Sequence, residues 1–318
     1  MKMTALPSKN NFPIDIPHAI PQFFIVGAPK CGTTALYEYL KDHPGIFLPN
    51  VKEPDYFASD FNQISQISTA EEYSNLFKNA SDKQIMGEGS VFYLYSQDAI
   101  RNILETKPDA KFIAMVRNPV DMFFSLHAQF LYSFWEDEQD PEKAWALQEE
   151  RQSGKNIPDL CREPKLLQYA EICALGSQLE RFIEAVPEEQ RLIFVLDDLK
   201  NSAADVYASS LEFLNMQHDG KTDFPVINDA KIHHNSKLAF QTRKMTQKLQ
   251  PVKKALRRIF PNMSSSLLKP FYDLQSRKII KKEQNPHFKT QLHQAFASEI
   301  KTLETLLKRD LSHWMKEQ

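Results

Sequence analysis

The stretch QFFIVGAPKCGTTALYEYL, residues 22–40, decides the fold of this 318-residue chain. Its first six residues are a short apolar run with Phe and β-branched side chains, which is typical of a strand buried on both faces. The turn GAPKCGTT follows at residues 27–34, and an amphipathic pattern then predicts a helix that stops before the His-Pro-Gly turn at residues 43–45. The stretch therefore predicts one strand–loop–helix unit.

The same alternation of strand and helix continues along the chain. Strands are predicted at QIMGE (residues 84–88), KFIAMVRNP (111–119) and RLIFVLDDL (191–199). Helical patterns separate them, and a long amphipathic helix closes the chain at residues 287–314. This order predicts an α/β fold with a mostly parallel central sheet, helices on both of its faces and a helical C-terminal part.

Length and charge bound the domain organisation. We expect a flexible arm over residues 1–20 and a single domain over residues 21–318, with residues 231–282 as a basic helical insertion or cap. That segment holds fourteen Lys and Arg against one acid, Asp273, a balance of +13 within a chain of net charge −2. The overall charge argues against nucleic-acid binding, whereas the segment favours an anion-facing surface. A set of solvated helix faces is the alternative interpretation.

Cysteine usage and the N-terminus bear on location. The three cysteines, Cys31, Cys161 and Cys173, are an odd number at no metal-ligand spacing, which favours a reducing compartment. The Pro-rich N-terminal residues contain no apolar run of signal-peptide length, and no run approaches the roughly 20 apolar residues of a membrane-spanning helix. We therefore expect a cytoplasmic protein whose contact with a membrane is at most peripheral.

The turn after the first strand predicts a phosphate site. Glycines at both ends of a strand-to-helix turn let several backbone N–H groups and the positive end of the helix point at one anion. Lys30 adds a full charge. The predicted binding residues are Gly27, Ala28, Pro29, Lys30, Cys31, Gly32, Thr33 and Thr34. An ordinary tight turn with an incidental lysine is the alternative.

The turn differs from that of a nucleoside triphosphatase. Such a loop has its lysine directly after the second glycine, whereas Lys30 precedes Gly32 by two residues. The strand at residues 112–116 also ends in Arg117, where a Mg²⁺-binding carboxylate would be expected. Ser125 follows about two helical turns later, so that it and Arg117 can reach one anion. These features favour a P-loop-like core that binds a nucleotide through cationic side chains, without a metal. Alternatively, Arg117 caps a strand end and Ser125 is a neutral helix residue.

Three motifs together resemble the sulfotransferases that use 3′-phosphoadenosine 5′-phosphosulfate: GAPKCGTT, KEPDYF at residues 52–57, and VRNPVDMFFS at residues 116–125. The resemblance covers about residues 20–316. It implies that Arg117 and Ser125 hold the 3′-phosphate of the nucleotide, and that Lys30 stabilises charge on the departing oxygen. The implied reaction moves a sulfonyl group to a hydroxyl, most in keeping with a carbohydrate or glycolipid, and leaves adenosine 3′,5′-bisphosphate.

The resemblance also implies a carboxylate base. Glycan-modifying sulfotransferases show E-x-x-[FY]-F with a glutamate base, and Glu53, Tyr56 and Phe57 match that pattern. Glu88 in GEGSVFYLY is a second carboxylate candidate for this role. The alternative for Glu53 is an exposed loop carboxylate that pairs with neighbouring Lys52.

The chain departs from the glycan-modifying pattern at two positions. Asp55 stands where many of these enzymes have histidine, and Gly89 stands where many have a substrate-contacting lysine. These departures disfavour a heparan-like polymer as the acceptor. Two other functions stay open: a kinase-like P-loop phosphotransferase that uses ATP and Mg²⁺, and a non-catalytic protein that binds an anionic glycan or membrane through residues 231–282.

Overall fold

The computed structural model describes residues 17–61, 64–65, 67–227, 231–233, 276–278 and 285–315. The chain divides into two compact units. The first comprises residues 1–117, 175–225 and 302–309, and the second comprises residues 118–174, 226–301 and 310–318. The GAPKCGTT turn (residues 27–34) and the KEPDYF motif (residues 52–57) both belong to the first unit.

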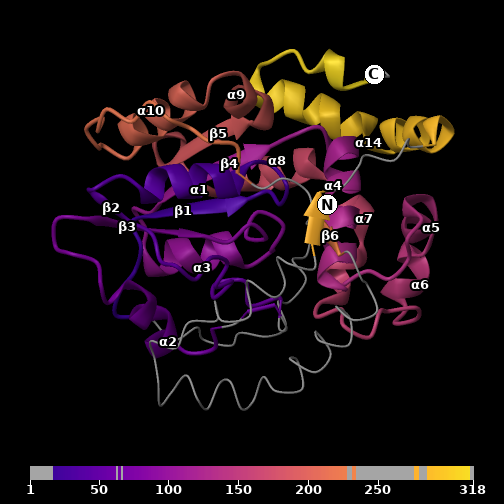
Figure 1. Ribbon diagram of the computed structural model, residues 1–318, viewed down its shortest axis with the longest axis horizontal. Helices are drawn as coiled ribbons and strands as arrows, with labels where there is room; N and C mark the ends of the chain where they lie inside the picture. The colour runs from indigo at the N-terminus through magenta and orange to yellow at the C-terminus, as the bar shows by residue number, and fades with distance from the viewer. Residues whose placement is uncertain are drawn as a thin grey trace, which may run out of the picture. The chain divides into compact units, whose positions relative to one another are not determined.

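A five-stranded parallel sheet forms the centre of the first unit (Figure 1). Its order is β2-β3-β1-β4-β5, with β1 at Phe23–Gly27, β2 at Ile46–Phe47, β3 at Ile85–Gly89, β4 at Lys111–Val116 and β5 at Arg191–Val195. Side chains of the central strand β1 are fully buried, as the uninterrupted apolar run predicts for a strand covered on both faces. The predicted parallel sheet is confirmed.

Helices cover both faces of this sheet. The first unit contains α1 (Thr33–Lys41), α2 (Ala70–Ser74), η1 (Asn75–Phe77), α3 (Ala99–Thr106), α8 (Leu175–Ala185), η3 (Glu188–Gln190), α9 (Leu196–Asn201) and α10 (Ala203–Phe213). Helix α1 contacts β1, β2 and α10, whereas α3 contacts α8. In Figure 1, α1 and α3 lie on opposite sides of β1. Because all five strands are parallel, their carboxyl ends lie at one edge of the sheet, and the loops that follow the strands meet there.

The second unit is mainly helical. It contains α4 (Pro119–Ser133), α5 (Pro141–Ala146), α6 (Gln148–Gln152), η2 (Pro164–Leu167), α7 (Tyr169–Ile172), β6 (Lys231–His233), β7 (Ser276–Lys278), the start of α14 (Pro286–Leu307) and η5 (Ser312–Met315). Strands β6 and β7 pair antiparallel. Arg151 and Glu136 form a fully buried ion pair at 2.6 Å, and the Tyr169 hydroxyl donates to the same carboxylate at 2.8 Å. This unit thus has a polar centre of its own.

Three predicted elements differ from the structure. The closing helix predicted at residues 287–314 ends at Leu307, and the separate 3-10 helix η5 follows it at Ser312–Met315. The strand predicted at residues 191–199 ends at Val195, because Asp198 accepts a hydrogen bond from the Val195 N–H at 3.1 Å and caps α9. The helical pattern that precedes this strand, at residues 166–186, is divided among η2, α7 and α8. The predicted arm falls largely, and the basic segment almost wholly, outside the described residues, so the domain division stays a prediction.

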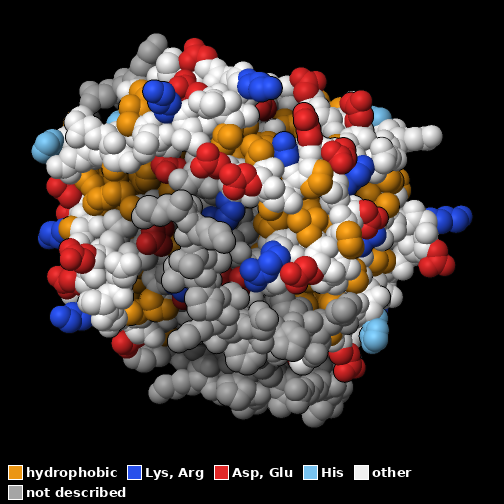
Figure 2. All heavy atoms as spheres, turned by 180° about the vertical axis from the view of Figure 1, so that it is seen from behind, with side chains coloured by type: hydrophobic (Ala, Val, Ile, Leu, Met, Phe, Trp, Pro, Cys, Tyr) orange, Lys and Arg blue, Asp and Glu red, His pale blue; other side chains and the backbone are white. Residues whose placement is uncertain are grey.

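The surface agrees with the near-neutral net charge. On the face shown in Figure 2, acidic and basic side chains of the described residues are interspersed between apolar ones. Among the described helices, none combines the length and the apolar character that crossing a bilayer requires.

Candidate nucleotide and acceptor site

The phosphate loop, residues 27–34, leaves the carboxyl end of β1 in a conformation that requires glycine. Gly27 has φ 141°, and a Cβ atom there would lie 2.5 Å from the backbone oxygen of Val91. Gly32, at φ 90°, directly precedes α1. The loop is tied to the neighbouring strand by the Ala28 N–H, which donates to the Met115 carbonyl at 2.7 Å. The first N–H groups of α1 therefore face the turn.

Gly27→Ala is expected to destabilise the protein by about 3 kcal/mol, because it combines an unfavourable φ with a backbone clash. Urea denaturation measures the loss. Gly220→Ala is the matched control, since Gly220 has φ 82° but no atom of a described residue within 4 Å of the point that a Cβ would occupy. The control should lose only about 1 kcal/mol, the cost of backbone strain alone. Equal losses in the two variants would show that the Val91 contact is unimportant.

Positive charge converges on the phosphate loop. The Arg117 guanidinium donates through Nη1 to the Lys30 carbonyl at 3.0 Å, and this places Arg117 beside the loop as predicted. Burial, followed by repulsion from Arg117, lowers the pKa of Lys30, and Lys52 acts in the same direction. Glu53 opposes these effects. A bound anion would relieve this repulsion, so the charges fit a phosphate or sulfate group.

Lys52 joins the phosphate loop to the acidic loop, which we define as residues 53–57. Its Nζ donates to Thr34 Oγ1 at 2.8 Å and pairs with Glu53 Oε1 at 3.2 Å. The same ammonium lies 5.8 Å from the centre of the Tyr37 ring. The Glu53 side chain is 37% exposed and is therefore accessible to a substrate. The sequence indicated the neighbouring Lys52–Glu53 pair but not the contact with Thr34.

Glu88, the second carboxylate candidate, lies in a different environment. It is fully buried on β3, and its two oxygens accept hydrogen bonds from Ser90 at 2.6 Å, Tyr73 at 2.8 Å and Tyr93 at 3.1 Å. Burial raises its pKa to about 7, although these three donors act in the opposite direction. Of the two carboxylates, Glu53 is the one that solvent and an acceptor can reach.

The raised pKa of Glu88 predicts a pH-dependent stability. The native state binds this proton more tightly than the unfolded state does, so stability falls as pH rises from about 4.5 to about 7. Wild type should lose about 3 kcal/mol relative to Glu88→Gln over that range. Urea denaturation of both proteins between pH 4.5 and 8 measures the difference. A difference that does not change with pH would show that Glu88 ionises normally.

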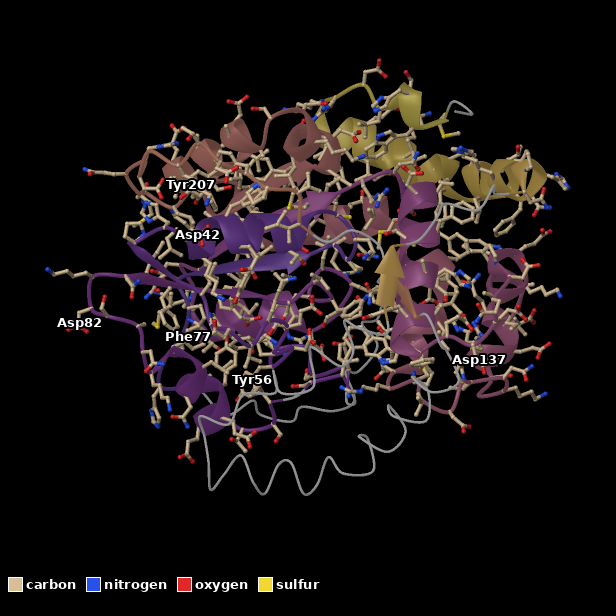
Figure 3. The ribbon with its side chains drawn as sticks, viewed as in Figure 1. Asp42, Tyr56, Phe77, Asp82, Asp137 and Tyr207 are labelled. Atoms are coloured by element: carbon tan, nitrogen blue, oxygen red, sulfur yellow. The ribbon has the colours of Figure 1, made fainter. Side chains whose placement is uncertain are left out.

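Asp55 is the second carboxyl group of the acidic loop. It is 4% exposed, and burial, followed by repulsion from Glu53 and Glu88, raises its pKa well above the usual range. Its Oδ1 has no hydrogen-bond partner among the described residues. The next residue, Tyr56, stacks on Tyr73 with ring centroids 4.7 Å apart, and the Tyr73 ring lies 5.5 Å from that of Phe77 (Tyr56 and Phe77 are labelled in Figure 3). The acidic loop thus carries one accessible and one buried carboxyl group.

The remaining predicted residues fall into three situations. Cys31 is buried, its Sγ donates to the Pro29 carbonyl at 3.4 Å, and burial raises its pKa to about 12, so only its backbone can serve an anion. Thr33 is 3% exposed. Ser125 lies on α4 in the second unit, and its pairing with Arg117 stays a prediction. Within the described part of the chain, no three His, Cys, Asp or Glu side chains are grouped to hold a metal ion.

Parallel strands with a cationic phosphate loop after β1 define an α/β protein of the phosphate-loop class. The chain belongs to the sulfotransferase domain family, which matches residues 20–298. This match confirms the resemblance seen in the motifs.

Individual relatives match shorter stretches. Heparan sulfate glucosamine 3-O-sulfotransferase 6 of Mus musculus is 37% identical over 111 residues, covering 35% of this chain and 31% of that protein. Bifunctional heparan sulfate N-deacetylase/N-sulfotransferase 3 of Homo sapiens is 28% identical over 206 residues, covering 62% of this chain and 22% of that protein. The chain thus spans less than a third of the length of these curated relatives.

A solved structure supports the fold over nearly the whole chain. The sulfotransferase from Alicyclobacillus acidocaldarius superposes with a TM-score of 0.68 at 24% identity, covering 94% of this chain and 100% of that chain. The α/β sulfotransferase fold is therefore confirmed.

Proposed function

We propose that this protein transfers a sulfonyl group from 3′-phosphoadenosine 5′-phosphosulfate to a hydroxyl of a carbohydrate or glycolipid. The observation that carries the proposal is the Lys52 contact, which joins Thr34 of the phosphate loop to Glu53. An anion site and an accessible carboxylate thereby lie next to each other. Sulfonyl transfer needs these two groups together: one for the donor and one for the proton of the acceptor.

The donor would be held by the phosphate loop. Backbone N–H groups at the start of α1 and the Lys30 ammonium bind the 5′-phosphosulfate, while Arg117 and Ser125 bind the 3′-phosphate. ATP has no 3′-phosphate to occupy that second position. The proposed donor site requires no metal, because the cationic side chains supply the positive charge.

Transfer then follows in one in-line step. The acceptor oxygen forms a bond to sulfur as the bond between sulfur and the bridging phosphate oxygen breaks. Glu53 takes the proton of the acceptor hydroxyl, and Lys30 stabilises the negative charge that develops on the departing oxygen. The products are a sulfate ester and adenosine 3′,5′-bisphosphate.

The acceptor class and the location rest on separate support. Two relatives are named for heparan sulfate, which supports a carbohydrate acceptor, whereas Asp55 and Gly89 depart from the glycan-modifying pattern. A cytoplasmic location is supported by the cysteine count, which is odd and at no metal-ligand spacing.

Calorimetric titration tests the donor site. Adenosine 3′,5′-bisphosphate should bind wild type with micromolar affinity, and Arg117→Ala should weaken that binding about 50-fold, because a charge-assisted contact with the 3′-phosphate is lost. ATP with Mg²⁺ is titrated in parallel. Preferential binding of ATP would favour the phosphotransferase, and binding of neither nucleotide would favour the glycan-binding protein.

A transfer assay completes the test. Radiolabelled donor is incubated with unsulfated heparosan and chondroitin oligosaccharides and with a neutral glycolipid, and slow transfer to water is measured without an acceptor. Labelled product or labelled free sulfate, formed only with the enzyme, supports the proposal.

A further inference from the structure

The acidic loop has a strained backbone. Glu53 has φ 62° and Asp55 has φ 52°, values that non-glycine residues rarely adopt. Pro54 lies between them, and its ring fixes its own φ. Two such residues in three positions cost about 1–3 kcal/mol each, so the surrounding contacts must hold this conformation in place.

The backbone N–H groups of the loop are held by the segment at and after the end of β3. The Glu53 N–H donates to the Gly89 carbonyl at 3.0 Å, and the Asp55 N–H donates to Ser90 Oγ at 3.0 Å. The Phe57 N–H donates to the Tyr93 hydroxyl at 3.2 Å. Two of the three acceptors are therefore side-chain hydroxyls, whose direction is free unless something else orients them.

Glu88 orients both hydroxyls. Ser90 Oγ donates to Glu88 Oε1 at 2.6 Å, and the Tyr93 hydroxyl donates to Glu88 Oε2 at 3.1 Å. Each hydroxyl has one proton, so donating it to the carboxylate leaves its lone pairs for the loop N–H. We call each such hydroxyl, which donates to Glu88 and accepts from a loop N–H, a relay. Two relays thus connect one buried carboxylate to the backbone that carries Glu53. Tyr73 also donates to Glu88 Oε2, at 2.8 Å, but its hydroxyl leads to no described N–H group of the loop.

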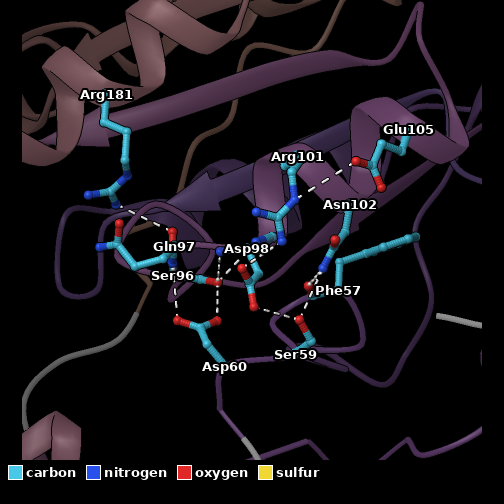
Figure 4. Close-up of polar contacts among 11 residues, drawn as sticks. Phe57, Ser59, Asp60, Ser96, Gln97, Asp98, Arg101, Asn102, Glu105 and Arg181 are labelled. Atoms are coloured by element: carbon cyan, nitrogen blue, oxygen red, sulfur yellow. Dashed lines mark hydrogen bonds and ion pairs between the residues drawn. The ribbon is translucent and has the colours of Figure 1, made fainter. Parts of the chain in front are cut away.

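A separate hydrogen-bond network holds residues 57–60, at the C-terminal end of the acidic loop and just after it (Figure 4). Asn102 donates to the Phe57 carbonyl at 2.9 Å, and Ser59 Oγ donates to Asp98 at 2.8 Å. The Asp60 carboxylate accepts from Ser96 Oγ and from the Gln97 N–H. These contacts fix residues 57–60 to the start of α3 without Glu88. Loss of the Glu88 relays should therefore affect the Glu53 end of the loop most.

We propose that Glu88 is the positioning residue of the reaction: through Ser90 and Tyr93 it fixes the backbone that aims Glu53 at the acceptor hydroxyl. The inference rests on the proposed function, in which Glu53 is the base. Glu88 itself stays away from the substrate, because it is fully buried and each of its oxygens accepts from a neighbouring hydroxyl. A buried carboxylate that accepts several hydrogen bonds fixes the position of the groups around it. The rate of proton transfer depends on the position of the base relative to the acceptor hydroxyl.

Single-hydroxyl variants test the proposal with little risk to folding. Ser90→Ala and Tyr93→Phe each break one relay, and Tyr73→Phe is the matched control because it removes a hydroxyl from the same carboxylate without touching a relay. We expect kcat of labelled sulfonyl transfer, to the best oligosaccharide probe or to water, to fall about 10- to 100-fold in the two relay variants. Tyr73→Phe should stay within about twofold of wild type.

Four further measurements separate an effect on positioning from an effect on stability. Affinity for adenosine 3′,5′-bisphosphate and the acceptor KM should change less than about threefold in the relay variants, because only the transfer step loses its base. Thermal stability should fall in both Tyr93→Phe and Tyr73→Phe, and more in Tyr93→Phe, because that variant also leaves the Phe57 N–H without its acceptor. Glu88→Gln should lower kcat at least as much as either relay variant, because its amide cannot accept all three hydroxyl protons.

The outcomes that overturn the proposal are distinct from those that overturn the base assignment. If Tyr73→Phe loses as much kcat as Tyr93→Phe, or if both relay variants keep wild-type kcat while Glu53→Gln is inactive, then Glu88 has no positioning role and Glu53 remains the base. If Glu53→Gln keeps full kcat, both the base assignment and the positioning role are wrong.

Discussion

Lys30→Ala is expected to lower kcat/KM about 10³-fold, which corresponds to about 4 kcal/mol of transition-state stabilisation. The Lys30 ammonium is partly buried beside Arg117 and Lys52, where water screens it poorly. In the proposed reaction, negative charge develops there on the departing oxygen. The rate is measured with labelled donor, and nucleotide affinity is measured by calorimetry. Affinity should weaken much less than kcat falls, because the loop amides still hold the phosphate.

Lys41→Ala provides the control for Lys30. Lys41 is the last residue of α1, at the end away from the phosphate loop, and its Nζ donates to Asn50 Oδ1 at 2.8 Å, so its loss removes one positive charge without touching the loop. It should keep wild-type kcat/KM within about twofold. Comparable losses in the two variants would mean that general charge, and not the position of Lys30, controls the rate.

Glu53→Gln is expected to lower kcat about 10³-fold, within the usual range for loss of a general base. The amide keeps the size of the side chain and can still accept from Lys52, so the loop should keep its shape. Affinity for adenosine 3′,5′-bisphosphate should change less than about threefold. Transfer assays and calorimetry on the same preparation measure the two effects.

Glu105→Gln is the control for Glu53. Glu105 is an exposed carboxylate that forms a weak ion pair with Arg101 at 3.9 Å on α3, so its loss should leave kcat unchanged. A folded Glu53→Gln protein with wild-type kcat would remove Glu53 from the mechanism. The proton would then have to leave through another group.

Local patterns predicted well the strand–loop–helix unit that carries the proposed donor site. The strand, the glycine spacing and the helix of residues 22–40 are all encoded by neighbouring residues, because apolar run length and turn chemistry act over a few positions. The placement of Arg117 beside the phosphate loop followed from the rule that parallel strands end at one edge. The contact of Arg117 with the Lys30 carbonyl agrees with that prediction.

Non-local contacts limited what could be predicted of the acceptor half. Glu53 and Glu88 look alike in sequence, and only pairing of β3 with β1 and β2 shows which one is buried. The link from Lys52 to Thr34 joins residues 18 positions apart. Strand β2 has two residues, too few for any periodicity, and exists because β3 pairs with it. The end of β5 at Val195 depended on one side-chain cap by Asp198.

The glycines that flank Glu88, Gly87 and Gly89, restrict the substitutions that this part of the sequence can accept. A Cβ atom at Gly89 would lie 2.8 Å from the Tyr37 ring, and one at Gly87 would lie 2.1 Å from the Phe23 ring. Tyr37 also donates to the Pro49 carbonyl at 2.5 Å, shortly before the acidic loop. A larger residue at position 89 is therefore compatible only with a smaller one at position 37. We expect these two positions to covary among related sequences, because a larger residue at position 89 alone would clash with the Tyr37 ring.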